Sequence, residues 1–259
     1  MKKSLPVFCL ALSSYFAQAQ ITYVNAAASG ANNGTTWANA YTNLQTALTN
    51  TASGSIWVVA GTYYPGTSGS NTATFTLKNN VSILGGFNGT ESGPTQRNPS
   101  VNVCILSGDL DQSGTLTAAD AYHVVSSGNA GATATIDGFT ITGGNAVGGG
   151  DDDHGAGIYC RPSSISIVGT PKIINCIVKQ NYANFYGGGI AIVCSNLTGA
   201  SASPQLLNCR IFANTSNGNG TEFTYSASVI GTGFSPNFEN CLTIVMLIQP
   251  SASIFAPQL

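Results

Sequence analysis

Charged residues are scarce in this chain. They make up 7% of its 259 residues, against about 25% in an ordinary globular domain. Lys and Arg together number 8, which disfavours nucleic-acid binding and attraction to an anionic membrane surface. Histidine occurs twice, and no Cys-x-x-Cys pair or His cluster indicates zinc. After the N-terminal leader, no apolar run is long enough to cross a bilayer, so we expect no transmembrane segment in the mature chain.

The first residues have the pattern of a secretory signal peptide. Lys2 and Lys3 precede an apolar run from Leu5 to Phe16, and Ala17-Gln-Ala19 is typical of a cleavage site. We expect residues 1–19 to be removed and the mature protein to be secreted or held at a cell surface. The remaining composition, 43% hydrophobic with 31 Gly and a net charge of -2, predicts a β-rich secreted protein and not a disordered one.

One short pattern returns three times near the C-terminus, starting at Pro171, Pro204 and Pro236. Each copy contains an Asn-Cys pair, and successive cysteines lie 33 and 32 residues apart. A second signature, Gly155-Ala-Gly-Ile158, returns 32 residues later as Gly187-Gly-Gly-Ile190. A period of this length indicates repeats that stack on one another. The runs within each copy are too short and too β-branched for helices, so the pattern predicts a parallel β-solenoid.

In such a solenoid, equivalent residues of neighbouring coils lie roughly 4.8 Å apart. Asn175, Asn208 and Asn240 should therefore stack, with their amides bonded to one another or to turn backbone. The mature chain has an even number of cysteines, and they could form disulfides or an internal ladder of buried thiols. They are Cys104, Cys160, Cys176, Cys194, Cys209 and Cys241.

Three further segments break the strand pattern or precede the regular repeats. Apolar residues recur at helical spacing over residues 36–48, which predicts an amphipathic helix that caps the open end of the stack. The segment from Thr133 to Thr142 resembles an earlier copy of the repeat, with Asp137-Gly138 in place of Asn-Cys. The acidic stretch at 148–154 is expected to project from the stack as a loop.

Several motifs of the N-terminal half occur together: Tyr23-Val-Asn25, Gly34-Thr-Thr-Trp37, Val59-Ala-Gly-Thr-Tyr63, Gly85-Gly-Phe-Asn-Gly-Thr-Glu91 and Ile105-Leu-Ser-Gly-Asp109. With them, the chain resembles the secreted right-handed parallel β-helix proteins of Bacteroidetes type. Its later repeats resemble the polymorphic outer-membrane protein repeats of the pectin-lyase-like superfamily. The resemblance implies one all-β domain over residues 20–245, a right-handed parallel β-helix with an N-terminal capping α-helix. It says little about activity, because this fold hosts lyases, hydrolases and adhesins.

The chain departs from that family at its end, where those proteins continue into a sorting domain. Residues 246–259 form an irregular Ala/Pro/Ser tail instead. We expect either that the end of the chain covers the lower end of the core or that the sequence is truncated.

The sharpest candidate site is a calcium loop over residues 109–120. Its oxygen-bearing side chains recur at the spacing of a twelve-residue calcium loop, with Gly114 at the turn position. We expect no entering helix, because Val103 to Leu106 reads as a strand. The alternative is an Asp/Ser/Gly-rich hairpin between two strands. The candidate ligands of a structural Ca²⁺ are Asp109, Asp111, Ser113, Thr115, Thr117 and Asp120.

A second candidate is the acidic run Asp151, Asp152 and Asp153 with His154 and the nearby Arg161. Pectate lyases of the resembling superfamily use clustered aspartates to hold calcium against a uronate and an arginine as base, so this run is a weak catalytic candidate. A solvated loop is the alternative. His123 reads as a packed strand residue.

The function expected from the sequence is therefore a non-catalytic binding or adhesion module that contacts glycans or other surface partners. Aromatic side chains at turns and strand ends could stack on sugar rings or pack inside: Tyr63, Tyr64, Tyr159, Tyr182, Phe185 and Tyr186. The alternatives are a polysaccharide lyase or hydrolase at Asp151 to Asp153 with calcium, and a structural spacer.

Overall fold

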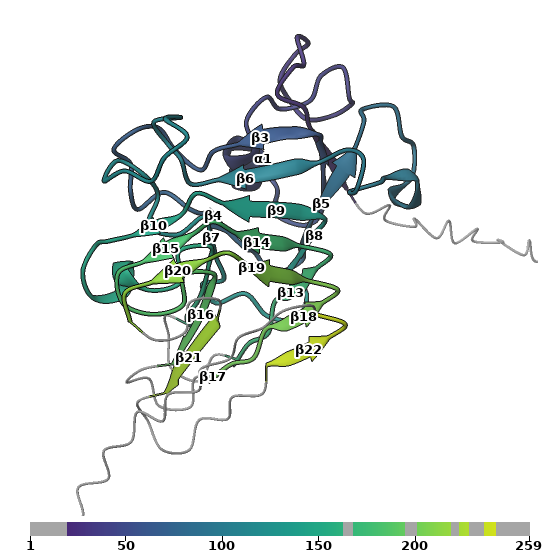
Figure 1. The fold of residues 1–259 in the computed structure, drawn as a ribbon. Coiled ribbons are helices and arrows are strands. Elements are labelled where there is room, and N and C mark those ends of the chain that lie inside the picture. The colour runs from purple at the N-terminus through teal and green to yellow at the C-terminus, as the bar shows by residue number, and fades with distance from the viewer. Residues whose placement is uncertain (1–19, 163–167, 195–200, 219–222, 228–235, 242–259) are drawn as a thin grey trace, which may run out of the picture.

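The computed structural model describes residues 20–162, 168–194, 201–218, 223–227 and 236–241. The predicted signal peptide, residues 242–245 and the predicted tail lie outside these residues. The described chain is a parallel β-solenoid of about 6 turns, so the all-β parallel fold expected from the repeat is confirmed (Figure 1). Every pairing between its strands is parallel within the described chain, as stacked coils require.

Three principal sheets run along the stack, and five successive coils contribute a strand to each of them in turn. Within the described residues, one further strand at each end of the stack extends sheet A alone. Sheet A comprises β1 (Ile21–Val24), β2 (Gly54–Val59), β5 (Val81–Phe87), β8 (Thr135–Asp137), β13 (Lys172–Ile174), β18 (Gln205–Leu207) and β22 (Asn237–Glu239). Sheet B comprises β3 (Gly61–Tyr63), β6 (Cys104–Ser107), β9 (Phe139–Thr142), β14 (Ile177–Lys179) and β19 (Arg210–Phe212). Sheet C comprises β4 (Phe75–Thr76), β7 (Val125–Ser126), β11 (Ile158–Cys160), β16 (Ile190–Cys194) and β21 (Phe223–Ala227).

Shorter elements complete the coils. The small sheets contain β10 (Asn145–Ala146), β15 (Tyr182–Ala183) and β20 (Thr215–Ser216), and separately β12 (Val168–Gly169) and β17 (Ser201–Ala202). The helical elements are α1 (Leu44–Asn50) and the single 3₁₀ turns η1 (Pro94–Gln96) and η2 (Gly150–Asp153).

The core lies inside the coil because side chains alternate between the two faces of each short strand. Ile173 and Leu206 pair across sheet A, Val178 and Ile211 pair across sheet B, and all four are fully buried. Ile158 pairs with Ile190 on sheet C, which confirms that the two glycine signatures stack on each other. The period read from the sequence is thus the length of one coil.

The corner between sheets A and B explains the repeated asparagine. Asn175, Asn208 and Asn240 have φ angles of 50°, 53° and 52°, a left-handed conformation that Asn adopts more easily than most residues. The observed pairing of Ile174 with Asp137 places Gly138, with φ 85°, at this corner. The predicted alignment of Asp137-Gly138 with Asn-Cys was therefore wrong by one residue, because a glycine supplies the left-handed corner in that coil.

The cysteines that follow the corner asparagines are free thiols in the described chain. Cys176 and Cys209 are fully buried, and their Sγ atoms lie 3.2 Å from the carbonyl oxygen of Ile174 and 3.3 Å from that of Ile173. Burial raises the pKa of Cys176 to about 12. The internal ladder is confirmed for these two residues, and the disulfide alternative is wrong for them.

The helix at the N-terminal end is shorter than predicted. It covers Leu44–Asn50 and not residues 36–48, because the Asn43 side chain caps it by accepting a hydrogen bond of 2.9 Å from the Thr46 N–H. Before this cap, Tyr41 bridges to Val24, and Trp37 packs against Tyr23 with ring centroids 4.6 Å apart. Leu44, Ala47 and Leu48 join the core beside the first coil.

Two long insertions leave the coil that contains β5, β6 and β7. Residues 88–103 precede β6 and residues 108–124 follow it, so one insertion projects at each end of this strand (Figure 1). They flank the outer face of sheet B. A third insertion, residues 147–157, connects β10 to β11 and contains the acidic run.

Candidate functional site

The outer face of sheet B is bordered by a cleft on each side. Its outward positions alternate with core residues, so Thr142 on β9, Lys179 on β14 and Phe212 on β19 form one row across neighbouring strands. Ile177 and Arg210 form a second row beside it. We call these five residues the sheet-B face. The strands are short, so the distance from one cleft to the other is about 10 Å.

The first cleft lies between this face and the 108–124 insertion, and its volume is about 340 Å³. Seven of its ten lining residues carry a hydroxyl, amide or carboxylate group, and the insertion adds one exposed leucine. The lining residues come from successive coils: Ser107, Asp109, Gly114, Thr115, Leu116, Thr142, Gly143, Gln180, Asn181 and Thr215. The cleft therefore runs along the stack and fits an extended ligand with polar groups better than a compact one.

The predicted calcium loop forms the wall of this cleft. One carboxylate oxygen from each of Asp109, Asp111 and Asp120 lies within 4.8 Å of the others. The predicted proximity of these three residues is therefore confirmed. The loop is not the hairpin considered as the alternative, because β6 and β7, the strands that it connects, belong to different sheets. A strand precedes it, as expected.

Backbone N–H groups hold the three carboxylates in place. Asp109 accepts hydrogen bonds from Ser113 and Gly114, at 3.0 and 2.9 Å. Asp120 accepts from Leu110 at 3.2 Å and from Thr117 at 2.6 Å. Each carboxylate oxygen has two lone pairs, so an accepted N–H leaves one of them for a cation.

The hydroxyl residues of the loop have different roles. The Thr117 hydroxyl donates to Asp111 Oδ2 at 2.8 Å, so it orients this carboxylate. The Ser113 hydroxyl bonds to the Thr115 carbonyl at 2.9 Å, and Thr115 also lines the first cleft. The Ser113 and Thr115 hydroxyls also lie 3.2 Å apart, so all three hydroxyl groups predicted as ligands are already engaged within the loop.

The three carboxylates of the loop lie close together, so their negative charges repel one another. Asp120 is fully buried, and burial together with the neighbouring Asp111 and Asp109 charges raises its pKa. Hydrogen bonds from Thr117 and Ser113 instead lower the pKa of the exposed Asp111. A bound divalent cation would offset the repulsion. The donor set of carboxylate oxygens suits a hard cation such as Ca²⁺, and further oxygens would have to come from backbone or water.

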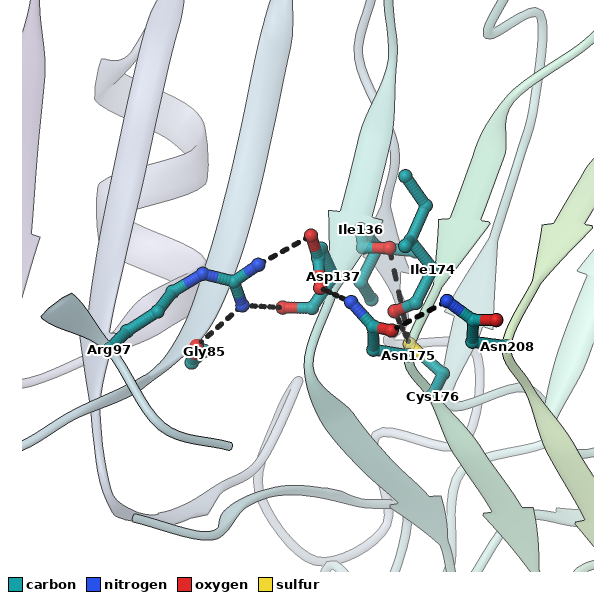
Figure 2. Close-up of polar contacts among 8 residues, drawn as sticks. All are labelled: Gly85, Arg97, Ile136, Asp137, Ile174, Asn175, Cys176 and Asn208. Carbon is teal, nitrogen blue, oxygen red and sulfur yellow. Dashed lines mark hydrogen bonds and ion pairs between the residues drawn. The ribbon is translucent and has the colours of Figure 1, made fainter. Parts of the chain in front are cut away.

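The second cleft lies on the other side of the sheet-B face, against residues 94–100, and its volume is about 660 Å³. Arg97 from this insertion reaches the strand ends of sheet A, where it donates to the Gly85 carbonyl at 3.0 Å and to Asp137 Oδ2 at 2.5 Å. Figure 2 shows that hydrogen bonds continue from this ion pair across the coils: Asp137 accepts from Asn175 at 2.8 Å, and Asn175 accepts from Asn208 at 3.3 Å. These bonds connect the insertion that forms one wall of the cleft to the strand ends that form its floor.

The acidic run forms the 3₁₀ turn η2, which directs its three aspartates toward different partners. Asp151 is ion-paired with Arg161, and a carboxylate oxygen of Asp153 lies against Nδ1 of His154. Asp152 Oδ1 lies 3.6 Å from Nε2 of His123. The structure therefore brings the predicted residues together, but each carboxylate has a cationic or ionisable partner. Competition from these partners weakens the run as a metal site.

His123 is packed as the sequence indicates, although it precedes β7 and is not inside a strand. It is buried and stacks on Tyr159, with ring centroids 4.5 Å apart. Burial lowers its pKa, and its Nδ1 lies 3.2 Å from the Gly155 carbonyl oxygen. Sequence reasoning missed its approach to Asp152, because only the fold brings residues of two insertions together.

Among the aromatic candidates, Tyr63 and Tyr159 are buried and unavailable for stacking on a sugar, while Phe185 is 46% exposed. Sequence reasoning also did not identify Lys179, Arg210 and Asn181 as site residues. For Asn181 the sequence did contain a signal, because Asn181 and Asn214 end two copies of the repeat and are one coil apart.

The described residues contain no helix with the length and hydrophobicity to span a membrane. Comparison with protein-family models, with curated proteins and with solved structures finds no match to this chain. The stacked parallel coils define the class of this protein, a parallel β-helix repeat protein.

Proposed function

We propose that this protein is a secreted or cell-surface binding module that holds an extended glycan along the sheet-B face. The carrying observation is the pair of clefts that border this face, lined from several coils by hydroxyl and amide groups. Such groups match the hydroxyls of a sugar chain, and the length of the clefts along the stack matches a linear ligand. We also propose that the protein is related to the pectin-lyase-like β-helix proteins of Bacteroidetes type. The motifs of its N-terminal half support that relation.

Calcium has a structural part in this proposal. Asp109 belongs both to the carboxylate cluster and to the lining of the first cleft. A Ca²⁺ ion held by Asp109, Asp111 and Asp120 would keep the 109–120 loop in the position that shapes the cleft.

Calorimetric titration with CaCl₂ tests the calcium site. We expect heat of binding for the wild type and its loss in Asp111→Asn, which keeps the size of the side chain but removes an exposed charge. Asp151→Asn, in the other acidic loop, is the matched control and should bind as the wild type does. Equal heats for all three proteins would refute the site.

A glycan array, followed by affinity measurements on any hit, tests the binding function. Thr142→Trp on β9 places a bulky side chain in the first cleft, and we expect it to abolish binding of the hit. Thr135→Trp, at a partly exposed position on β8 of sheet A, is the control and should leave it intact. Absence of any hit would favour the structural spacer.

A lyase or hydrolase at Asp151 to Asp153 is the second hypothesis, because Arg161 and His123 converge on this run. Incubation with uronate polysaccharides and calcium tests it. An unsaturated or reducing product that disappears in Asp151→Asn would establish catalysis.

A further inference from the structure

The basic residues of the described chain divide into two groups. Three of them have partners within the protein. Lys78 donates to the carbonyls of Leu48 and Thr51 at the C-terminal end of α1, and Arg97 and Arg161 are paired with aspartates. The other three have no ion pair among the described residues: Lys172, Lys179 and Arg210. A chain with only 8 Lys and Arg in total thus leaves a large share of its positive charge unneutralised.

Two of the three unpaired cations lie together on the sheet-B face. Val178 and Ile211 point into the core, so their neighbours Lys179 and Arg210 point outward from β14 and β19. These strands are adjacent, and Ile177 pairs with Arg210 while Lys179 pairs with Phe212. Strand geometry then separates the Cα atoms of Lys179 and Arg210 by about 8 Å, a diagonal across neighbouring strands.

Arg210 is held in place without being neutralised. Its guanidinium carbon lies 5.1 Å from the centroid of the Phe212 ring, and the residue is exposed. A guanidinium over an aromatic ring keeps its N–H donors at the edge available for a planar anion. Arg210 also lines the second cleft, where the charge of Arg97 is already offset by Asp137.

We propose that Lys179 and Arg210 make the sheet-B face a site for the anionic groups of an acidic glycan, either carboxylate or sulfate. This inference rests on the proposed function and specifies its ligand class. Arg210 would donate to two anionic oxygens in parallel, and Lys179 would contact the next anionic group along the chain. The surrounding amides and hydroxyls, including Asn175, Asn208 and Thr142, supply partners for sugar hydroxyls.

Affinity measurements with matched polymers test the inference, at one fixed calcium concentration for every polymer and variant so that the 109–120 loop stays in the same state. Dextran sulfate against dextran isolates sulfate, and polygalacturonate against its methyl ester isolates carboxylate. We expect at least one acidic polymer to bind with an affinity that falls as salt rises, and its neutral counterpart to bind at least tenfold more weakly. The acidic polymer that binds identifies the source of the anionic group.

Variants locate the site. Arg210→Gln and Lys179→Gln should each weaken binding of the acidic polymer about tenfold, the effect of one charge-assisted contact. Lys172→Gln is the matched control: it removes another unpaired cation, but from the outer side of sheet A, and should change affinity less than twofold. Equal losses in all three variants would indicate attraction to net charge and overturn the site.

The remaining outcomes separate the two proposals. Equal binding of neutral and acidic polymers, unchanged in Arg210→Gln, would overturn this inference and leave glycan binding intact. Binding of polyglutamate as tightly as of the acidic glycan would overturn the assignment to glycans. If neither these polymers nor any arrayed glycan binds, the proposed function fails as well.

Discussion

The buried asparagine ladder below the first cleft allows a quantitative test of the fold. Asn181 is 1% exposed, and its side chain makes four hydrogen bonds. Its oxygen accepts from the Gly144 N–H at 2.9 Å. Its amide nitrogen donates to the carbonyls of Ile141 and Lys179, at 3.2 and 3.0 Å, and to the side-chain oxygen of Asn214 at 2.9 Å.

Replacing Asn181 with Ala removes these contacts and leaves buried backbone groups without partners. The amide nitrogen has two hydrogens for its three acceptors, so the side chain makes the equivalent of three full bonds. At about 1 kcal/mol for each, we expect the free energy of unfolding to fall by about 3 kcal/mol. Asn181→Leu keeps the volume and should cost nearly as much, because the orphaned groups remain. Urea denaturation followed by tryptophan fluorescence measures the loss as a shift in midpoint at constant slope.

Asn184→Ala is the matched control, in the same coil but on its surface. This asparagine is exposed and accepts one bond of 3.0 Å, from Asn217. Its loss should cost about 0.5 kcal/mol or less. If Asn181→Ala costs under about 1 kcal/mol, or no more than Asn184→Ala, the ladder does not hold the coils together and the reasoning is refuted.

Three other predictions follow from the same packing. Gly157→Ala places a methyl group 2.5 Å from the Gly189 carbonyl oxygen and should cost about 1–3 kcal/mol in the same assay, whereas Gly149→Ala, with open space around it, should cost little. Asn208→Val should cost about 1–2 kcal/mol because a β-branched residue resists the left-handed corner, and Asn208→Gly should be nearly neutral. The Cys176 thiol, whose pKa burial raises to about 12, should resist iodoacetamide at pH 8 until the protein unfolds, as mass spectrometry would show.

The raised thiol pKa also sets a direction for alkaline stability. Below about pH 8.5, the ordinary thiol value, both states keep the proton and stability is unaffected. Between that value and about pH 12, the unfolded state releases the Cys176 proton first, so the free energy of unfolding falls as pH rises. Burial also raises the pKa of Cys104 and Cys209, so Cys176→Ala should make this part of the curve less steep and not flat. An unchanged slope would contradict the assignment.

The sequence alone determined the repeat unit and therefore the fold. Cysteines 33 and 32 residues apart specify one coil, since stacking requires equivalent residues to recur at the coil length. The same pattern is sufficient to place Asn175 against Asn208 and Cys176 beside Cys209. It also brought Asp109, Asp111 and Asp120 together, because all three lie within twelve residues and local spacing controls their approach.

Only the tertiary structure decided what lies around these elements. The Arg97–Asp137 pair, the approach of His123 to Asp152 and the two clefts depend on insertions whose path is not encoded by the repeat period. The register of β14 and β19 also decided that Lys179 and Arg210 point outward, because a shift of one residue turns every side chain to the other face of the strand. The period fixes the stack, whereas long-range contacts between coils fix the surface that can bind a ligand.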